Sequence, residues 1–258
     1  MGIKVGEVLR ISVRCRISAS TMKECIDAIT AVVDEGRLKI SEEGFRLRAV
    51  DPANVAMVSF ELSSDAFEEF EFEEEEELEV GIDFVKLSSI IDMGKGETAE
   101  LEFDTEKHKL YTKLGSLAYT ISLLDPSTIR KEPKVPELDL PVQVVIEADV
   151  FRRAIRAAEK IGDHILLGVD GDVFYMETES DTDKVRFELG KEQLIDIIPG
   201  VVRSMYSLEY LSAMSKGLSR ADHITLSIGK DYPLRIDFEL ADGYAHVSYL
   251  LAPRIEAE

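Results

Sequence analysis

Phe60-Glu61-Leu62 recurs as Phe187-Glu188-Leu189, 127 residues further along the chain, and this repeat points to the fold. Leu123-Leu124-Asp125-Pro126 has its counterpart at the same spacing in Leu250-Leu251-Ala252-Pro253. Gly44-Phe45-Arg46-Leu47 precedes the first triplet, and Asp172-Val173-Phe174-Tyr175 precedes the second. Matched features in one order, half a chain apart, indicate a duplicated domain.

Each half alternates between helical and strand periodicity. Apolar residues recur every three or four positions in residues 20–34, 83–94, 150–161 and 208–217, which predicts two helices per half. Short apolar or alternating runs predict strands at 38–47, 55–62, 99–103, 109–114, 117–123, 142–146, 165–169, 173–177, 184–189, 224–228, 234–240 and 244–251. Many short strands with few helices are typical of an α+β fold.

The two halves are joined by a proline-rich segment. Residues 125–141 contain Pro126, Pro133, Pro136 and Pro141, half of the eight prolines in the chain. Proline removes backbone donors and favours an extended chain, so we expect an ordered connector on the surface. The predicted organisation is an N-terminal domain at 1–124, a connector at 125–141 and a C-terminal domain at 142–258.

Composition excludes several classes of protein. The chain has 258 residues, 45% of them hydrophobic, and a net charge of −21, which is globular but argues against coating nucleic acid by charge. No apolar run approaches the ~18 residues of a membrane span, and the first residues lack a signal-peptide core. Two cysteines and four scattered histidines predict neither disulfides nor a zinc site.

Four short motifs, in order on this duplicated chain, suggest a family. They are Val50-Asp51-Pro52-Ala53-Asn54-Val55, Ile161-Gly162-Asp163, Asp231-Tyr232-Pro233-Leu234 and Leu251-Ala252-Pro253-Arg254-Ile255. From about residue 13 to the end, the chain resembles the sliding clamps of archaea and eukaryotes, the proliferating cell nuclear antigen family. About twelve residues before that point look like an extension without an assigned role.

The resemblance implies a ring of three chains, with antiparallel sheets outside and helices around double-stranded DNA. Such a homotrimer slides on DNA as a processivity factor in replication and repair. It tethers DNA polymerase, the clamp loader (replication factor C), flap endonuclease and DNA ligase through a short hydrophobic-aromatic motif. It catalyses nothing and needs no cofactor or metal. It would be cytoplasmic in an archaeon and nuclear in a eukaryote.

The third helix supports this interpretation independently. Arg153, Arg156 and Lys160 fall on one arc, opposite its apolar face, which suits phosphate contact without base recognition. An ordinary solvated helix face is the alternative. With the resemblance, the positions expected to face DNA are Lys23, Lys86, Arg153, Arg156, Lys160, Lys216 and Arg220. Glu24 and Asp27 on the outward arc of the first helix weaken this face.

The resemblance also implies a partner pocket and a joint between subunits. The pocket positions are Val50, Val55, Met57, Val135, Pro136, Leu138, Tyr232, Pro233, Leu250, Leu251, Ala252, Pro253 and Ile255. Several of these, such as Leu251 and Val55, equally suit the core. The joint would pair residues 114–122 of one chain with 181–189 of the next, through Leu117, Tyr119, Ile121, Val185 and Phe187.

Two other features of the sequence favour ordinary structural interpretations. Nine glutamates in residues 68–79 are best interpreted as a solvated loop or edge strand outside the ring. No catalytic constellation is recognisable, because the histidines are scattered and Cys25 lies on an apolar helix stripe. The alternatives to a homotrimeric clamp are an acidic interaction scaffold that does not encircle DNA and one subunit of a heterotrimeric clamp.

Overall fold

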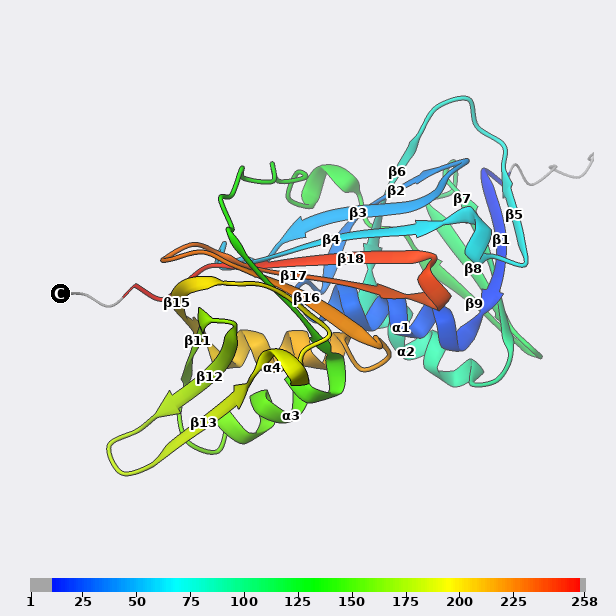
Figure 1. Ribbon diagram of the computed structural model, residues 1–258. Helices are drawn as coiled ribbons and strands as arrows, with labels where there is room; N and C mark the ends of the chain where they lie inside the picture. Colours follow the sequence, from blue (N-terminus) through cyan, green and yellow to red (C-terminus); the bar gives the residue numbers. More distant parts are fainter. Residues whose placement is uncertain (1–10, 256–258) are drawn as a thin grey trace, which may run out of the picture.

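The computed structural model describes residues 11–255 and arranges them as two halves with the same order of elements (Figure 1). The first half contains β1 (Val13–Ser18), α1 (Ala19–Thr30), β2 (Glu35–Ser41), β3 (Gly44–Val50), β4 (Ala56–Ser63), β5 (Glu69–Phe72), β6 (Leu78–Asp83), α2 (Phe84–Ile91), β7 (Thr98–Asp104), β8 (Lys109–Leu114) and β9 (Leu117–Ser122). Most of the suggested N-terminal extension lies outside the described residues.

The second half repeats this order element by element. It contains β10 (Val142–Glu147), α3 (Ala148–Ala158), β11 (His164–Gly171), β12 (Val173–Glu179), β13 (Lys184–Leu189), β14 (Asp196–Ile198), β15 (Gly200–Ser207), α4 (Leu208–Gly217), β16 (His223–Ile228), β17 (Leu234–Leu240) and β18 (Ala245–Leu251). The two Phe-Glu-Leu triplets lie in β4 and β13, which are equivalent strands.

All four predicted helices are present, but the strand predictions were incomplete. The single strand expected at 38–47 is a hairpin of β2 and β3, turning before Gly44, whose φ of 125° favours glycine. β1, β6, β14 and β15 were not predicted, and β5 lies in the acidic run that was expected to be a solvated loop or an edge strand. In β5 the alternation of Glu69-Phe70-Glu71-Phe72 is a strand pattern that the surrounding glutamates obscured.

Three antiparallel sheets organise the chain. Their strand orders are β5-β1-β7-β8-β9, β14-β10-β16-β17-β18-β4-β3-β2-β6 and β13-β12-β11-β15. The nine-stranded sheet crosses from one half to the other, because β18 of the second half pairs with β4 of the first. β9 and β13 occupy the same places in the order of elements as β18 and β4. Each of them lies at the edge of its sheet and could form a similar joint.

The four helices lie together on one face of the central sheet, while the connector passes over the opposite face (Figure 1). α1 packs against both α2 and α4, so the helix layer also spans the two halves. Gly217 permits the close approach of α4 to α1, since a Cβ there would lie 2.3 Å from the Tyr249 hydroxyl and 3.1 Å from Ala28 Cα. Within residues 11–255, no helix is long and apolar enough to span a membrane.

Candidate functional site

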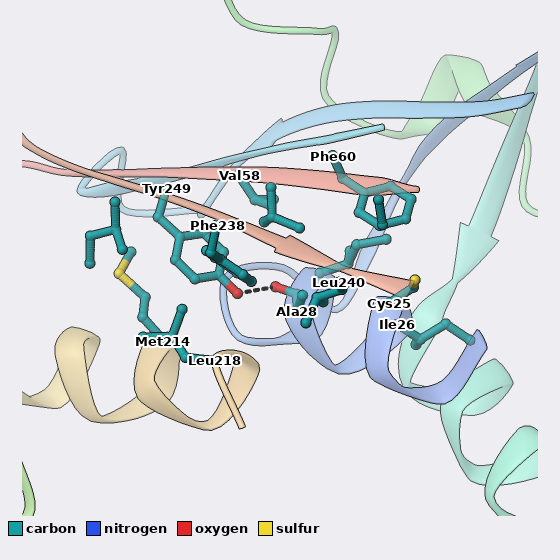
Figure 2. Close-up of a cluster of buried hydrophobic side chains, with 14 of the residues drawn as sticks. Cys25, Ile26, Ala28, Val58, Phe60, Met214, Leu218, Phe238, Leu240 and Tyr249 are labelled. Carbon is teal, nitrogen blue, oxygen red and sulfur yellow. Dashed lines mark hydrogen bonds between the residues drawn. The ribbon is translucent and has the colours of Figure 1, made fainter. Parts of the chain in front are cut away.

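The joint between the two halves is a sealed apolar layer. Val58 and Phe60 of β4 meet Tyr249 of β18, with Met214 of α4 packed beneath (Figure 2). The Tyr249 hydroxyl donates a 2.7 Å hydrogen bond to the Ala28 carbonyl oxygen, which ties the second half to α1. Because Tyr249 is fully buried, this bond satisfies its only polar group.

Four of the cations expected to face DNA stand free on the helix layer. Lys86 on α2, Arg156 on α3, Lys160 just after α3 and Lys216 on α4 are exposed. Among residues 11–255, none of these four side chains makes an ion pair. Exposed cations of this kind can reach phosphate groups and give weak, salt-dependent contact.

The other three cations expected to face DNA lie close to acidic side chains or to an apolar groove. Lys23 pairs with Asp27 one turn along α1, which neutralises its charge locally. Arg220 lies near enough to Glu24 to act on its ionisation. Arg153 lines an apolar groove beside β13 that also contains Phe187.

The interpretation of Glu24 as part of the outward arc was wrong. Its Oε1 accepts a 2.9 Å hydrogen bond from the Ala241 N–H in the turn between β17 and β18. Burial raises the pKa of the Glu24 carboxyl, against the lowering effects of that hydrogen bond and of Arg220. Glu24 therefore belongs to the joint between the halves, where periodicity alone could not place it.

The partner-pocket residues of the first domain and of β18 form one apolar row. Val50, Met57 and Leu250 are direct cross-strand neighbours on β3, β4 and β18, so their side chains share the face opposite the helices. The Ala252 N–H donates a 2.8 Å hydrogen bond to the Val55 carbonyl oxygen, bringing the C-terminal segment beside this row. Leu251 points to the other face and is fully buried in the core.

The connector lies across a cavity from the Leu250 end of this row. This cavity of about 630 Å³ lies beneath the connector, with Val135, Pro136 and Leu138 on the connector side and Leu250 on the sheet side. Val135 is 45% exposed, and beyond the cavity Tyr232 and Ile255 are 44% and 76% exposed. Apolar side chains of the connector and of β17 and β18 thus border one open cavity, whose lining also includes charged and polar side chains of the sheet. Pro233, Ala252 and Pro253 are half-buried.

Asp51 organises the turn between β3 and β4 that ends in Val55. Its carboxylate accepts hydrogen bonds from the N–H groups of Ala53, Val55 and Ala56, and from the Tyr210 hydroxyl of α4 at 2.9 Å. Burial alone would raise the pKa of the Asp51 carboxyl, but these four donors together lower it. Burial, with the nearby Asp51, raises the pKa of Tyr210 to about 12, so its hydroxyl keeps its proton.

The motif around Asp51 supports the family resemblance, but the sequence does not predict a site role for Asp51 or Tyr210. The spacing of Asp51 and Asn54 is a turn signal, and it could have suggested a side chain bonded to its own turn. The partner in α4, 159 positions away, had no sequence signal.

Charged side chains hold the first part of the connector to the first domain. Arg37 donates two hydrogen bonds to the Ile129 carbonyl oxygen, at 3.0 and 2.6 Å. Glu132 pairs with Lys39 at 2.6 Å and with Arg48 at 3.3 Å. The hydrogen bond from Lys39 is the main cause of the lowered pKa of Glu132. The connector is therefore fixed before it reaches the cavity.

The residues expected at the joint between subunits lie on two separate sheet edges. Leu117, Tyr119 and Ile121 lie on β9, with Leu117 41% exposed and Tyr119 half-buried. Val185 and Phe187 lie half-buried on β13. A groove of about 340 Å³ runs between α3 and β13, with an apolar lining made by Ala154, Ala157, Ala158, Ile165, Met176, Val185 and Phe187.

The acidic run is partly an edge strand. β5 pairs with β1, and there Arg14 and Arg16 meet Glu71 and Glu69. Residues 73–77 form the loop that follows β5. Within the described residues, no group of three or more His, Cys, Asp or Glu side chains could hold a metal ion.

Comparison with known proteins identifies the family. The model of the proliferating cell nuclear antigen N-terminal domain matches residues 14–110, and that of the C-terminal domain matches residues 134–254. The chain belongs to the proliferating cell nuclear antigen family.

Its relatives include archaeal DNA polymerase sliding clamps. That of Methanosarcina barkeri is 49% identical over 95% of this chain and 99% of its own. That of Methanothrix thermoacetophila is 51% identical over 94% of this chain and 98% of its own. Among solved structures, A. fulgidus PCNA bound to the C-terminal region of FEN-1 superposes with a TM-score of 0.89 at 39% identity, covering 95% of this chain and all of that one. The clamp fold and the duplicated domains are thus confirmed.

Proposed function

We propose that three copies of this sliding clamp close into a ring around duplex DNA and tether replication and repair enzymes, without catalysing a reaction themselves. The observation that supports this best is the match between the joint inside the chain and the two free sheet edges. β18 and β9 are equivalent strands, as are β4 and β13. What β18 and β4 do within one chain, β9 and β13 can do between chains.

The register inside the chain gives the register between chains. Val247 pairs with Phe60 and Tyr249 with Val58 in the joint within the chain. The hairpin registers make Leu117 equivalent to Val247 and Tyr119 equivalent to Tyr249, so the equivalent pairs between subunits are Leu117 with Phe187 and Tyr119 with Val185. Such a head-to-tail contact covers both edges and leaves none exposed once the ring closes.

The surfaces on either side of these edges complement each other. Leu117 and Met93 are 41% and 61% exposed next to β9, and the groove beside β13 has an apolar lining. In the joint within the chain, the apolar side chains of β4 and β18, such as Val58 and Tyr249, are fully buried. Burial of this apolar area would drive ring closure.

The ring would place the helix layer, with Lys86, Arg156, Lys160 and Lys216, around DNA, and the connector with its pocket on the outside. Partners named by the family resemblance, such as polymerase, the clamp loader, flap endonuclease and ligase, would insert their motif between the connector and the row Val50, Met57 and Leu250. A tethered enzyme that leaves the primer end stays nearby at high effective concentration. As its relatives are archaeal, we place it in the cytoplasm. The proposed domain division is 1–124, 125–141 and 142–258.

Solution mass and retention on DNA test the proposal. Sedimentation equilibrium should give 86.7 kDa, three times the 28.9 kDa of one chain. Loaded clamps should remain on closed circular DNA and slide off after linearisation. A strict monomer at all concentrations would favour a heterotrimer subunit or the plain scaffold. A trimer that leaves circular and linear DNA equally fast would refute encirclement.

A further inference from the structure

At the edge of the joint inside the chain, the first half contributes an acidic side chain and the second half contributes a basic one. Glu24 on α1 accepts the Ala241 N–H, and Arg220, in the turn between α4 and β16, exerts an attraction on the same carboxylate. The acid is on the helix of the first domain, and the base is on a turn of the second. This pair lies at the edge of the apolar layer that contains Tyr249.

The residue equivalent to Glu24 in the second domain is Arg153. α1 begins at Ala19 and α3 at Ala148, and their N–H groups donate to the equivalent carbonyl oxygens of Glu97 and Asp222. Counting from these starts, Glu24 and Arg153 are both the sixth residue. Arg153 is exposed, and among residues 11–255 it has no ion-pair partner. Its charge is opposite to that of Glu24.

The residue that would face Arg153 across the joint is also identifiable. The turn between α4 and β16 corresponds to that between α2 and β7, which ends at Glu97. Glu97 lies against the β8–β9 turn, because a Cβ on Gly115 would be 2.5 Å from its Oε2. Glu97 is exposed and, within the described part of the chain, forms no ion pair. Glu97 is the counterpart of Asp222, and what places it opposite Arg153 is the β8–β9 turn, which corresponds to the β17–β18 turn that contacts Glu24.

We propose that Arg153 belongs to the joint between subunits, where it forms an ion pair with Glu97 of the neighbouring chain, rather than to the surface that contacts DNA. This inference rests on the proposed ring. The lengths of the turns and of the side chains also suit this pair. β8 and β9 are joined by only Gly115 and Ser116, a shorter turn than the one that reaches Glu24, and arginine is longer than glutamate. Arg153 also lines the groove that the neighbouring β9 would cover.

The reversed polarity gives the joint specificity. Within the chain the helix provides the acid, and between chains the helix provides the base. If the turn that contains Glu97 in a neighbouring chain approached α1 instead of α3, Glu97 would meet Glu24, which carries the same charge. Like-charge contacts suppress wrong pairings, while opposite charges at the rim favour the correct encounter. Arg153 and Glu97 therefore direct each free edge to its proper partner during ring assembly.

A charge exchange tests the pair. Arg153→Glu and Glu97→Arg should each weaken trimer association about tenfold, since each replaces an attraction by a repulsion at a partly exposed rim. The double variant should recover most of the loss. Lys230→Glu, a matched reversal on the exposed β16–β17 turn, should leave association unchanged. The measurement is sedimentation velocity over a dilution series at low and high salt, with circular dichroism to verify folding.

The outcomes separate this inference from the ring itself. Phe187→Asp, at the centre of the β9–β13 contact, should yield monomers, and failure there or a monomeric wild type would refute the ring. If the wild type is a trimer but both single reversals associate normally, or the double variant is weaker than either, the Arg153–Glu97 pair is refuted. Normal association of Arg153→Glu with reduced retention on DNA would return Arg153 to the DNA-facing set.

Discussion

Tyr210→Phe should loosen the partner pocket from the opposite domain. The substitution removes one oxygen atom and keeps the ring, so only the 2.9 Å hydrogen bond to Asp51 is lost. Asp51 is 5% exposed and keeps its three backbone donors. Hydrogen bonds to charged groups contribute about 1.5–3 kcal/mol, and the remaining donors favour the lower end, about 1.5 kcal/mol of the free energy of unfolding.

The loss should depend on pH in a direction that the structure fixes. The four hydrogen bonds lower the pKa of Asp51 below its ordinary 3.8, so the carboxylate stabilises the fold above that pH. This contribution disappears as the pH falls through the folded-state pKa. Without the Tyr210 donor that pKa rises. The difference between wild type and variant is therefore full at pH 7 and shrinks below about pH 4.

Urea unfolding at fixed protein concentration measures the stability loss, and titration calorimetry with a FEN-1 C-terminal peptide measures the pocket. We expect a few-fold weaker peptide binding, because the turn that ends in Val55 loses its tie to α4. Tyr244→Phe, at a tyrosine that is 46% exposed, is the control and should change stability by less than about 0.5 kcal/mol. Equal unfolding curves for Tyr210→Phe and wild type at pH 7 would refute the role assigned to this hydrogen bond.

Three further predictions concern the other surfaces. Arg156→Glu with Lys160→Glu should reduce clamp-loader-dependent retention on circular DNA while the trimer mass stays constant, and undiminished retention would contradict the assigned DNA face. Pro253→Asp with Ile255→Asp should abolish peptide binding in calorimetry without breaking the ring, and unchanged binding would place the pocket elsewhere. Glu132→Gln removes the connector's ion pairs, so trypsin should cut the connector several-fold faster; an equal rate would mean that other contacts hold it.

The sequence alone determined the duplication and the family. The repeated Phe-Glu-Leu triplets lie in equivalent strands, and the apolar stripes of α1 to α4 are local patterns with a period set by the backbone. Local pattern fails where composition hides it, as in β5, whose alternating Glu and Phe lie inside an acidic run. It also fails at Glu42-Glu43, where a sharp turn interrupts what looked like one strand.

The tertiary structure alone decided which charges are free and which are engaged. Glu24 and Arg153 are the sixth residues of equivalent helices, and helical periodicity places both on a solvated arc. Only the packing of the two halves shows that Glu24, on this arc of α1, contacts the second domain. Likewise the bond from Tyr210 to Asp51 joins residues 159 positions apart. A sequence specifies local geometry through nearby residues, whereas such contacts depend on how whole sheets pair, which no short stretch of sequence encodes.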